Sequence, residues 1–245
     1  MGKLYVVSIG PGREEYLTPA AREAIERCDV VSGYTSYIKQ VKHIIGDKEI
    51  IQTGMHKEIE RCRAAVQAAN GGKTVALVSG GDAGVYGMAG LVLEIVEKEG
   101  FFYSVEVGVV PGITSATACA SLLGAPLMHD FVTISLSNWL TEMSLIEKRL
   151  HCAGDGDFVV TIYNPKSKAR PDIINKARDI LLEYKDKNTP VGIVRNAYRD
   201  TQEIELTTLE KMCESVIDMR TTVVVGNAAT YIANGRMITP RGYKV

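Results

Sequence analysis

A glycine-dense stretch with a single acid, VSGGDAGVYGMAGL, runs from Val78 to Leu91 and follows the apolar run TVAL. Glycines let backbone N–H and C=O groups approach a bound molecule closely. Other apolar runs end in comparable loops, which read GPG, PGITS, YNPKS, RNA and GNAAT. In a parallel sheet such loops gather at the carboxyl edge of the strands, where ligands bind. We therefore expect a ligand site at that edge, built largely from backbone groups.

Two of the loops imitate nucleotide-binding motifs without matching them. GPGREE supplies Gly10 and Gly12, but Glu15 stands where a dinucleotide fingerprint needs its third glycine, and the second strand runs into Ser32 and Gly33 instead of an acid. The GKT triplet lacks the earlier glycine of a P-loop and precedes a strand instead of following one. A nicotinamide oxidoreductase and a phosphate cradle are therefore disfavoured. Such loops could hold a polar cofactor with an apolar portion without a dedicated charge, and S-adenosylmethionine, which combines a sulfonium, an amino acid group and an adenosine, is one such molecule.

Composition excludes several classes of partner. The chain has 245 residues, 46% of them hydrophobic and 23% charged, with a net charge of -1, so nothing attracts it as a whole to nucleic acid or to an anionic membrane. Its five cysteines are dispersed and form no CxxC pair, a pattern typical of reduced thiols in a cytoplasmic protein. The histidines show no metal-ligand spacing, so we expect no metal site.

The elements that must position these loops alternate between apolar runs and helical patterns. Thr18 and Pro19 are expected to start the first helix as its cap and its first residue. Further strands are expected at FVTISLS, DFVVTIYN, PVGIVRNA and TTVVVGNA, with helices before the last three. This alternation predicts an α/β fold with mainly parallel sheets. We place the domains at residues 1–110 and 111–245. The charge-free stretch 107–128 contains Pro111 and Pro126, so we do not expect it to span a membrane.

In their order and spacing, motifs along nearly the whole chain resemble those of the tetrapyrrole methylases of cobalamin biosynthesis. The resemblance is strongest to the precorrin-3B C(17)-methyltransferase group, which includes the cobalt-factor III enzymes. The motifs are IGPG, TGMHKEIERCRAA, VALVSGGDAGVYGMAGL, VVPGITSA, LLGAPLMHDFVTISLS, YNPKSKAR, VGIVRNA, VVVGNAAT and RMITPRGY. GDAGVYGMAGL and RMITPRGY favour this group over sister methylases.

The resemblance implies two α/β domains with S-adenosylmethionine in the cleft between them, usually in a homodimer. Carried over motif by motif, it also implies the residues that contact this cofactor. These are Pro11, Gly80, Gly81, Asp82, Val85, Thr114, Ser115, Asn164, Ala197 and, more loosely, Asn227.

The same residues also have purely structural interpretations. Asp82 could cap the following helix, and the glycines around it could serve a tight turn alone. Thr114 and Ser115 could simply open a helix. The sequence leaves these alternatives open.

The implied reaction transfers a methyl group to ring carbon 17 of a tetrapyrrole and contracts the macrocycle. The sulfonium already makes the methyl electrophilic, so positioning should dominate that step, whereas contraction needs an acid or a base. Candidates for that role are Ser135, Ser137, Tyr163 and His129, and the sequence does not choose among them.

The carboxylates of a tetrapyrrole need basic partners, although each candidate could equally lie on a solvated charged surface. The candidates are Lys166, Lys168, Arg170, Arg195, Arg199 and Arg241. The segment LSNWLTEM departs from the family pattern LSDLLTPW, with Asn138 in place of an acid and with an unusual Trp139, and Ala228 replaces a common serine. These departures concern the substrate more than the methyl donor.

Other functions remain possible from the sequence. A sister tetrapyrrole methylase, a diphthine synthase or an rRNA methyltransferase would share the fold and the cofactor. A non-catalytic ligand-binding protein would share the fold alone. Binding of S-adenosylmethionine, measured by calorimetry, would separate the last possibility from the enzymes.

Overall fold

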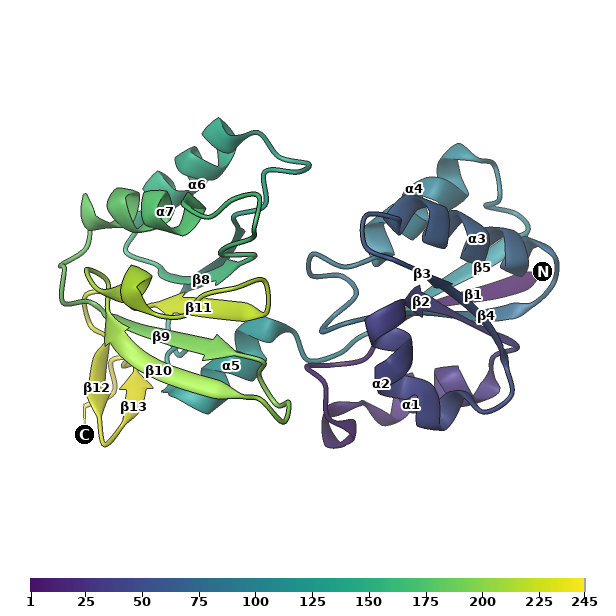
Figure 1. Ribbon diagram of the computed structural model, residues 1–245, viewed down its shortest axis with the longest axis horizontal. Helices are drawn as coiled ribbons and strands as arrows, with labels where there is room; N and C mark the ends of the chain where they lie inside the picture. Colours follow the sequence, from purple (N-terminus) through teal and green to yellow (C-terminus); the bar gives the residue numbers. More distant parts are fainter. Residues whose placement is uncertain (245) are drawn as a thin grey trace. The chain divides into compact units, whose positions relative to one another are not determined.

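The computed structural model describes residues 1–244, which form two compact units, Met1–Ser115 and the part from Ala116 onward (Figure 1). Each unit has a central sheet and hydrophobic clusters of its own. The α/β fold class expected from the sequence is therefore confirmed.

The sheet of the first unit is parallel throughout. Its strands lie in the order β3-β2-β4-β1-β5. They are β1 (Gly2–Ser8), β2 (Val30–Tyr34), β3 (Glu49–Thr53), β4 (Thr74–Ser79) and β5 (Val105–Val110). One face carries α1 (Pro19–Arg27) and α2 (Thr35–Ile45), and the other carries α3 (Glu58–Asn70) and α4 (Ala89–Lys98) (Figure 1). Because β1 lies between β4 and β5, the loops that follow these three strands are neighbours.

Local sequence explains most of these elements. Strand β1 is covered by helices on both faces, since Val6 packs with α3 and α4 while Val7 packs with α1 and α2. Thr18 caps α1 as expected, because its Oγ1 accepts a hydrogen bond from the backbone N–H of Ala21 at 3.1 Å. The edge strand β3 was not expected: it is largely exposed, so it shows no apolar run.

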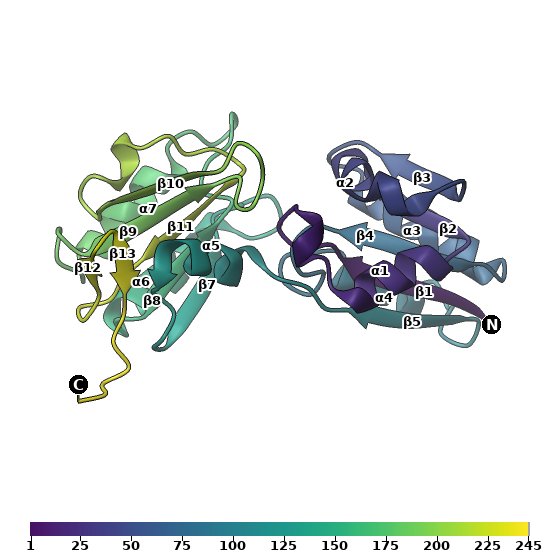
Figure 2. The same ribbon diagram turned by 90° about the horizontal axis from the view of Figure 1, so that it is seen from below.

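The main sheet of the second unit is mixed, with strand order β10-β9-β11-β8-β7. Its strands are β7 (Phe131–Ser135), β8 (Val159–Tyr163), β9 (Pro190–Arg195), β10 (Glu203–Thr208) and β11 (Thr221–Val225). Helices α6 (Met143–Asp155) and α7 (Ile173–Leu182) pack on one face, and α5 (Ser115–Leu123) packs on the other. A small sheet joins β12 (Tyr231–Ala233), β13 (Arg236–Ile238) and β6 (Gly124–Ala125). Figure 2 shows the chain leaving β13 as an extended tail.

The expectation of mainly parallel pairing is wrong for this second sheet. Only β7 and β8 are parallel among its described pairs, while β11 runs antiparallel to both β8 and β9, and β10 runs antiparallel to β9. A parallel connection needs a crossover of about a dozen residues or more, and the loop 196–202 between β9 and β10 is too short for one. The helix expected before TTVVVGNA is also missing, because β10 and a short 3₁₀ turn (Met212–Glu214) occupy that part of the chain.

The charge-free stretch 107–128 is divided among the end of β5, a loop, the nine-residue helix α5 and β6. Within residues 1–244, no helix combines the length and the apolar character needed to cross a membrane.

Candidate functional site

Loops after β1, β4 and β5 meet at the carboxyl edge of the first sheet. The backbone N–H of Gly10 donates to the carbonyl of Gly81 at 3.1 Å, and the N–H of Gly81 donates to the carbonyl of Gly10 at 2.9 Å. Both residues have a positive φ, 67° and 65° respectively, which glycine adopts at little steric cost. This reciprocal pair joins the GPG loop to the SGGD loop.

The carboxylate of Asp82 joins the loop after β4 to the loop after β5. Its Oδ1 accepts a hydrogen bond from the N–H of Gly84 at 2.8 Å, and its Oδ2 accepts one from the N–H of Gly112 at 2.9 Å. Helix α4 begins only at Ala89, with Met88 as its N-cap. The interpretation of Asp82 as a helix cap is therefore wrong; its carboxylate fixes the edge by bridging two loops.

Small residues allow these loops to approach one another. A Cβ on Gly112 would lie 2.5 Å from the Cβ of Ser8 and 2.7 Å from the carbonyl oxygen of Gly81. The hydroxyl of Ser8 accepts a hydrogen bond from the N–H of Ala83 at 2.8 Å. A Cβ on Gly80 would lie 2.7 Å from the ring of Tyr37. Close packing therefore accounts for Gly112, while at Gly80 the crowding comes from the side chain of Tyr37.

Gly81 differs, because space remains where its side chain would stand. A Cβ there would lie no closer than 3.8 Å to the atoms of Ile113 and Thr114. The first unit gathers the cofactor residues that the resemblance assigned to it along this edge. These are the buried Pro11 and the partly exposed Gly80, Gly81, Asp82, Val85, Thr114 and Ser115.

In the second unit, β7, β8 and β9 run in the same direction, so the loops after them share one edge of the sheet. Asn164 follows β8 with φ of 51°, and its side-chain amide donates to the Oγ of Ser135 at 2.9 Å. Ala197 follows β9 and the buried Asn196, whose amide donates to the Oγ1 of Thr201 at 3.0 Å. Asn164 and Ala197 therefore lie at the same edge.

Hydroxyl groups at this edge have defined hydrogen-bond roles. The Oγ of Ser135 accepts from Asn164 and also from the N–H of Ser137 at 3.2 Å, so its own O–H is left to donate. The phenol oxygen of Tyr163 accepts from the N–H of Ala116 at 2.7 Å, at the start of α5. The three hydroxyl groups lie close together, because Ser135 pairs with Tyr163 across β7 and β8 and bonds to the N–H of Ser137. Their grouping is compatible with a shared acid–base role.

Asn227 is not grouped with Asn164 and Ala197. Because β11 is antiparallel to β8, with Val225 opposite Val160, the GNAAT loop lies beside the beginning of β8. The expectation that every strand-ending loop gathers at one edge is therefore wrong for GNAAT. Asn227 is buried, and its Oδ1 accepts from the N–H of Ala229 and from Thr230 Oγ1, at 3.1 and 2.9 Å. These bonds hold the turn that leads to β12.

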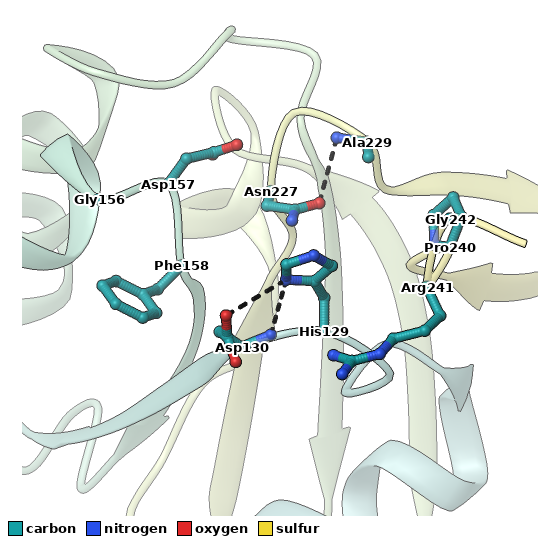
Figure 3. A pocket seen from close by; sticks show the side chains of 10 residues that line it. All are labelled: His129, Asp130, Gly156, Asp157, Phe158, Asn227, Ala229, Pro240, Arg241 and Gly242. Atoms are coloured by element: carbon teal, nitrogen blue, oxygen red, sulfur yellow. Dashed lines mark hydrogen bonds and ion pairs between the residues drawn. The ribbon is translucent and has the colours of Figure 1, made fainter.

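A pocket of about 490 Å³ lies at this opposite edge (Figure 3). It is lined by His129, Asp130, Gly156, Asp157, Phe158, Asn227, Ala229, Pro240, Arg241 and Gly242. The Nδ1 of His129 accepts a hydrogen bond from the N–H of Asp130 at 2.8 Å and lies 3.7 Å from its carboxylate. That nitrogen cannot donate a proton to Asp130 at the same time. His129 therefore forms no charge relay with Asp130. Its place at this opposite edge also separates it from Ser135, Ser137 and Tyr163.

The six basic candidates do not form a single group. Arg241 lines the pocket beside His129 (Figure 3), whereas Lys166, Lys168 and Arg170 follow β8 at the other edge. The guanidinium of Arg195 already pairs with Glu203 and lies 3.8 Å from the carboxylate of Asp218.

Asp218 itself is held in its charged form. Burial alone would favour the neutral acid, but hydrogen bonds from Arg220 and Thr221 hold the pKa of Asp218 below its usual value.

Arg170 and Arg199 also lie on the edge that follows β8 and β9. The Nη1 of Arg170 donates to the carbonyl of Leu136 at 2.7 Å, which ties the loop after β8 to the loop after β7. Arg199 lies in the turn between β9 and β10, where its N–H donates to the carbonyl of Asn196 at 3.0 Å.

The residues that support these loops, above all Ser8, Tyr37 and Gly112, were not predicted from the sequence. The sequence did offer one signal of close packing, since the neighbouring strands β1 and β4 each end in a small residue, Ser8 and Ser79. Both serines are buried in the structure. Across the described residues there is no group of three or more His, Cys, Asp or Glu side chains arranged to hold a metal ion.

Comparison with known proteins gives consistent matches. Residues 3–213 match the family model of the Tetrapyrrole (Corrin/Porphyrin) Methylases. The chain is 51% identical to a cobalt-factor III methyltransferase of Priestia megaterium, over 99% of this chain but only 45% of that longer protein. It is also 51% identical to a probable cobalt-factor III C(17)-methyltransferase of Salmonella typhimurium, over 98% of this chain and 99% of that one.

The fold also matches that of a solved structure. The crystal structure of the methyltransferase CobJ superimposes with a TM-score of 0.93 at 35% identity, covering 98% of this chain and all of that one. The mixed second sheet is therefore part of a known architecture.

Proposed function

Because this chain belongs to the tetrapyrrole (corrin/porphyrin) methylases, we propose that it methylates ring carbon 17 of cobalt-factor III in cobalamin biosynthesis. S-adenosylmethionine is the methyl donor. One observation carries the proposal: 51% identity to a probable cobalt-factor III C(17)-methyltransferase across 98% of this chain and 99% of the relative. The Priestia relative, also 51% identical, bears the same substrate in its name, which favours the cobalt-bound substrate over metal-free precorrin-3B.

The edge after β1, β4 and β5 fits a cofactor held mainly by backbone groups. Space remains beside Gly81, where a Cβ would meet nothing within 3.8 Å, while the Gly10–Gly81 pair and the Asp82 bridge fix the surrounding backbone. When bound, S-adenosylmethionine supplies an electrophilic methyl group. The residues proposed to contact it are Pro11, Gly80, Gly81, Asp82, Val85, Thr114, Ser115, Asn164 and Ala197. Asn227 leaves this set, because its side chain is buried in the turn before β12.

Methyl transfer from a sulfonium needs alignment and exclusion of water more than it needs a base. Ring contraction breaks and forms bonds within the macrocycle, so it needs an acid or a base nearby. We assign that task to the group formed by Ser135, Ser137 and Tyr163, because Ser135 can donate its O–H while Asn164 and Ser137 hold its oxygen. His129 lies about 20 Å away along β7, six residues at about 3.3 Å each, and takes no part.

Among the basic candidates, Lys166, Lys168 and Arg199 are proposed to bind the substrate carboxylates. Arg170 and Arg195 support the loops through Leu136 and through Glu203 and Asp218 respectively. Arg241 lies at the other edge of the sheet, beside His129.

We also propose that the protein is a cytoplasmic homodimer with domains near residues 1–110 and 111–245. The five cysteines are all free thiols in the described structure, which suits a reducing compartment. Light scattering coupled to size-exclusion chromatography would measure the oligomeric state.

The decisive test supplies the protein with labelled S-adenosylmethionine and either cobalt-factor III or precorrin-3B. The proposal expects one methyl added to the cobalt-bound ring, seen by mass spectrometry, and a changed visible spectrum as contraction alters conjugation. Methylation of an uncontracted ring would keep the methyltransferase and refute the coupled contraction. Transfer only to RNA or protein would identify a different methyltransferase, and binding without transfer to any acceptor would indicate a ligand-binding protein.

A further inference from the structure

Two apolar side chains in the loop between β7 and α6, those of Trp139 and Leu140, are exposed to solvent. Trp139 is 73% exposed and Leu140 is 91% exposed, and the two are consecutive. Trp139 is the single tryptophan of the chain. Exposed leucines are common on protein surfaces, but tryptophan is normally highly buried, and an exposed one beside an apolar neighbour indicates a surface that binds something.

The base of this loop, by contrast, is firmly held. Leu136 is fully buried, its N–H donates to the carbonyl of Tyr163 at 2.9 Å, and its carbonyl accepts from Arg170 at 2.7 Å. Trp139 and Leu140 therefore stand on a fixed base, three and four residues beyond Leu136. That base adjoins the loop that carries Lys166, Lys168 and Arg170.

The charge around this loop cluster favours an anionic ligand. No carboxylate of the described residues lies within ion-pair distance of Lys166 or Lys168. Helices α6 and α7 both begin at this edge of the sheet, but their N-cap residues are the acids Glu142 and Asp172. The positive charge available to an anionic ligand therefore comes from Lys166 and Lys168. A ligand that suits both features has an apolar face and carboxylates at its rim.

We propose that the indole of Trp139 stacks on the face of the tetrapyrrole ring, while Lys166 and Lys168 bind carboxylates on its rim. This inference rests on the proposed function and names the residue that recognises the ring. It also gives a role to the segment LSNWLTEM, which contains the single tryptophan of the chain. Aromatic stacking favours flat ring systems through dispersion and burial of apolar area.

The test compares Trp139→Ala and Trp139→Phe with wild type, using cobalt-factor III and S-adenosylmethionine. Trp139→Ala should raise the KM for the tetrapyrrole about tenfold, the effect of one lost aromatic contact, with kcat and the KM for S-adenosylmethionine within about twofold of wild type. Trp139→Phe should keep most of the affinity. Tyr103→Ala is the matched control, because Tyr103 is 89% exposed at the turn before β5, at the amino edge of the first sheet.

Hydroxyl-radical footprinting of wild type provides a second measurement that does not depend on how the variants fold. The tetrapyrrole should protect residues 139–140 from oxidation, and S-adenosylmethionine alone should not. If wild type methylates the tetrapyrrole while Trp139→Ala matches Tyr103→Ala and no protection occurs, stacking is refuted and the proposed function stands. If wild type methylates no tetrapyrrole, the proposed function fails, and this inference fails with it.

Discussion

At the scale of single residues, the glycines of the first unit's edge are required for different reasons. Gly112 leaves no room for a Cβ, because Ser8 and the carbonyl of Gly81 stand within 2.7 Å of its position. Gly81 leaves room, and what constrains it is its φ of 65°. Glycine is thus required by close packing at position 112 and by backbone conformation at position 81.

Gly81→Leu should weaken binding of S-adenosylmethionine at least tenfold more than Gly81→Ala. Both variants carry the backbone strain of a side chain at positive φ, about 1–2 kcal/mol, so the difference between them isolates the bulk that fills the space beside Thr114. Calorimetric titration measures the affinity, and circular dichroism verifies the fold. Equal affinities in the two variants would place the cofactor away from Gly81.

Gly112→Ala should lower the free energy of unfolding by about 1–3 kcal/mol, the usual range for overpacking. Its new Cβ would meet the Cβ of Ser8 at 2.5 Å, and backbone on both sides limits relaxation. Gly90→Ala is the control, since nothing lies within 4 Å of its Cβ position and alanine favours a helix. Denaturant unfolding compares the two, and similar stabilities would contradict the close packing of the loops.

At the scale of elements, the direction of a strand decides which loops can meet. The periodicity of apolar residues located β7, β8, β9 and β11 correctly, but it carries no information about direction. The GNAAT loop was therefore expected beside Asn164 and lies beside the start of β8 instead. The short segment 196–202 permits a hairpin but not a crossover, so it sets β10 antiparallel to β9. The direction of β11 follows only from its pairing with β8 and β9.

Asp218→Asn should destabilise the protein at pH 7 by about 1–2 kcal/mol, because the carboxylate accepts bonds from Arg220 and Thr221 and lies near Arg195. Since folding lowers the pKa of Asp218, the stability it contributes is present above the unfolded pKa, about 3.9, and is lost as pH falls through the folded value. The gap between variant and wild type should therefore shrink below about pH 4.

Thermal unfolding between pH 7 and pH 3 measures this gap for Asp218→Asn. Asp200→Asn, at an exposed position in the turn before β10, should match wild type throughout. A gap that is constant with pH would mean that the charge of Asp218 contributes nothing.

At the scale of the whole molecule, motif order identified the family, and the comparisons confirm it. The roles of individual charges could not be predicted in the same way. Arg195 pairs with Glu203 and lies near Asp218, and neither contact was predicted. Glu203 reaches it because β10 pairs with β9 and sets the two residues opposite each other. Such partners depend on strand pairing, which the spacing of residues along the chain does not reveal.

Each unit contains a buried thiol, and both thiols should lower the free energy of unfolding at alkaline pH. Burial raises the pKa of Cys62 on α3 and of Cys119 on α5 to about 11 in each case, whereas in the unfolded chain a cysteine titrates near 8.5. Between these values the unfolded state binds fewer protons than the folded state, so the free energy of unfolding must fall as pH rises. The loss approaches about 3 kcal/mol for each thiol near pH 11.

Replacing both thiols, Cys62→Ala with Cys119→Ala, should therefore flatten the decline in stability between pH 8.5 and pH 10.5, a window chosen from these pKa values. Denaturant unfolding at each pH measures it, and near pH 7 the variant should show only the modest cost of two small cavities. Cys152→Ala, which removes an exposed thiol, should retain the wild-type slope and so account for lysines and tyrosines that titrate in the same window. Parallel curves for the double variant and wild type would mean that Cys62 and Cys119 ionise as readily in the fold as in the unfolded chain.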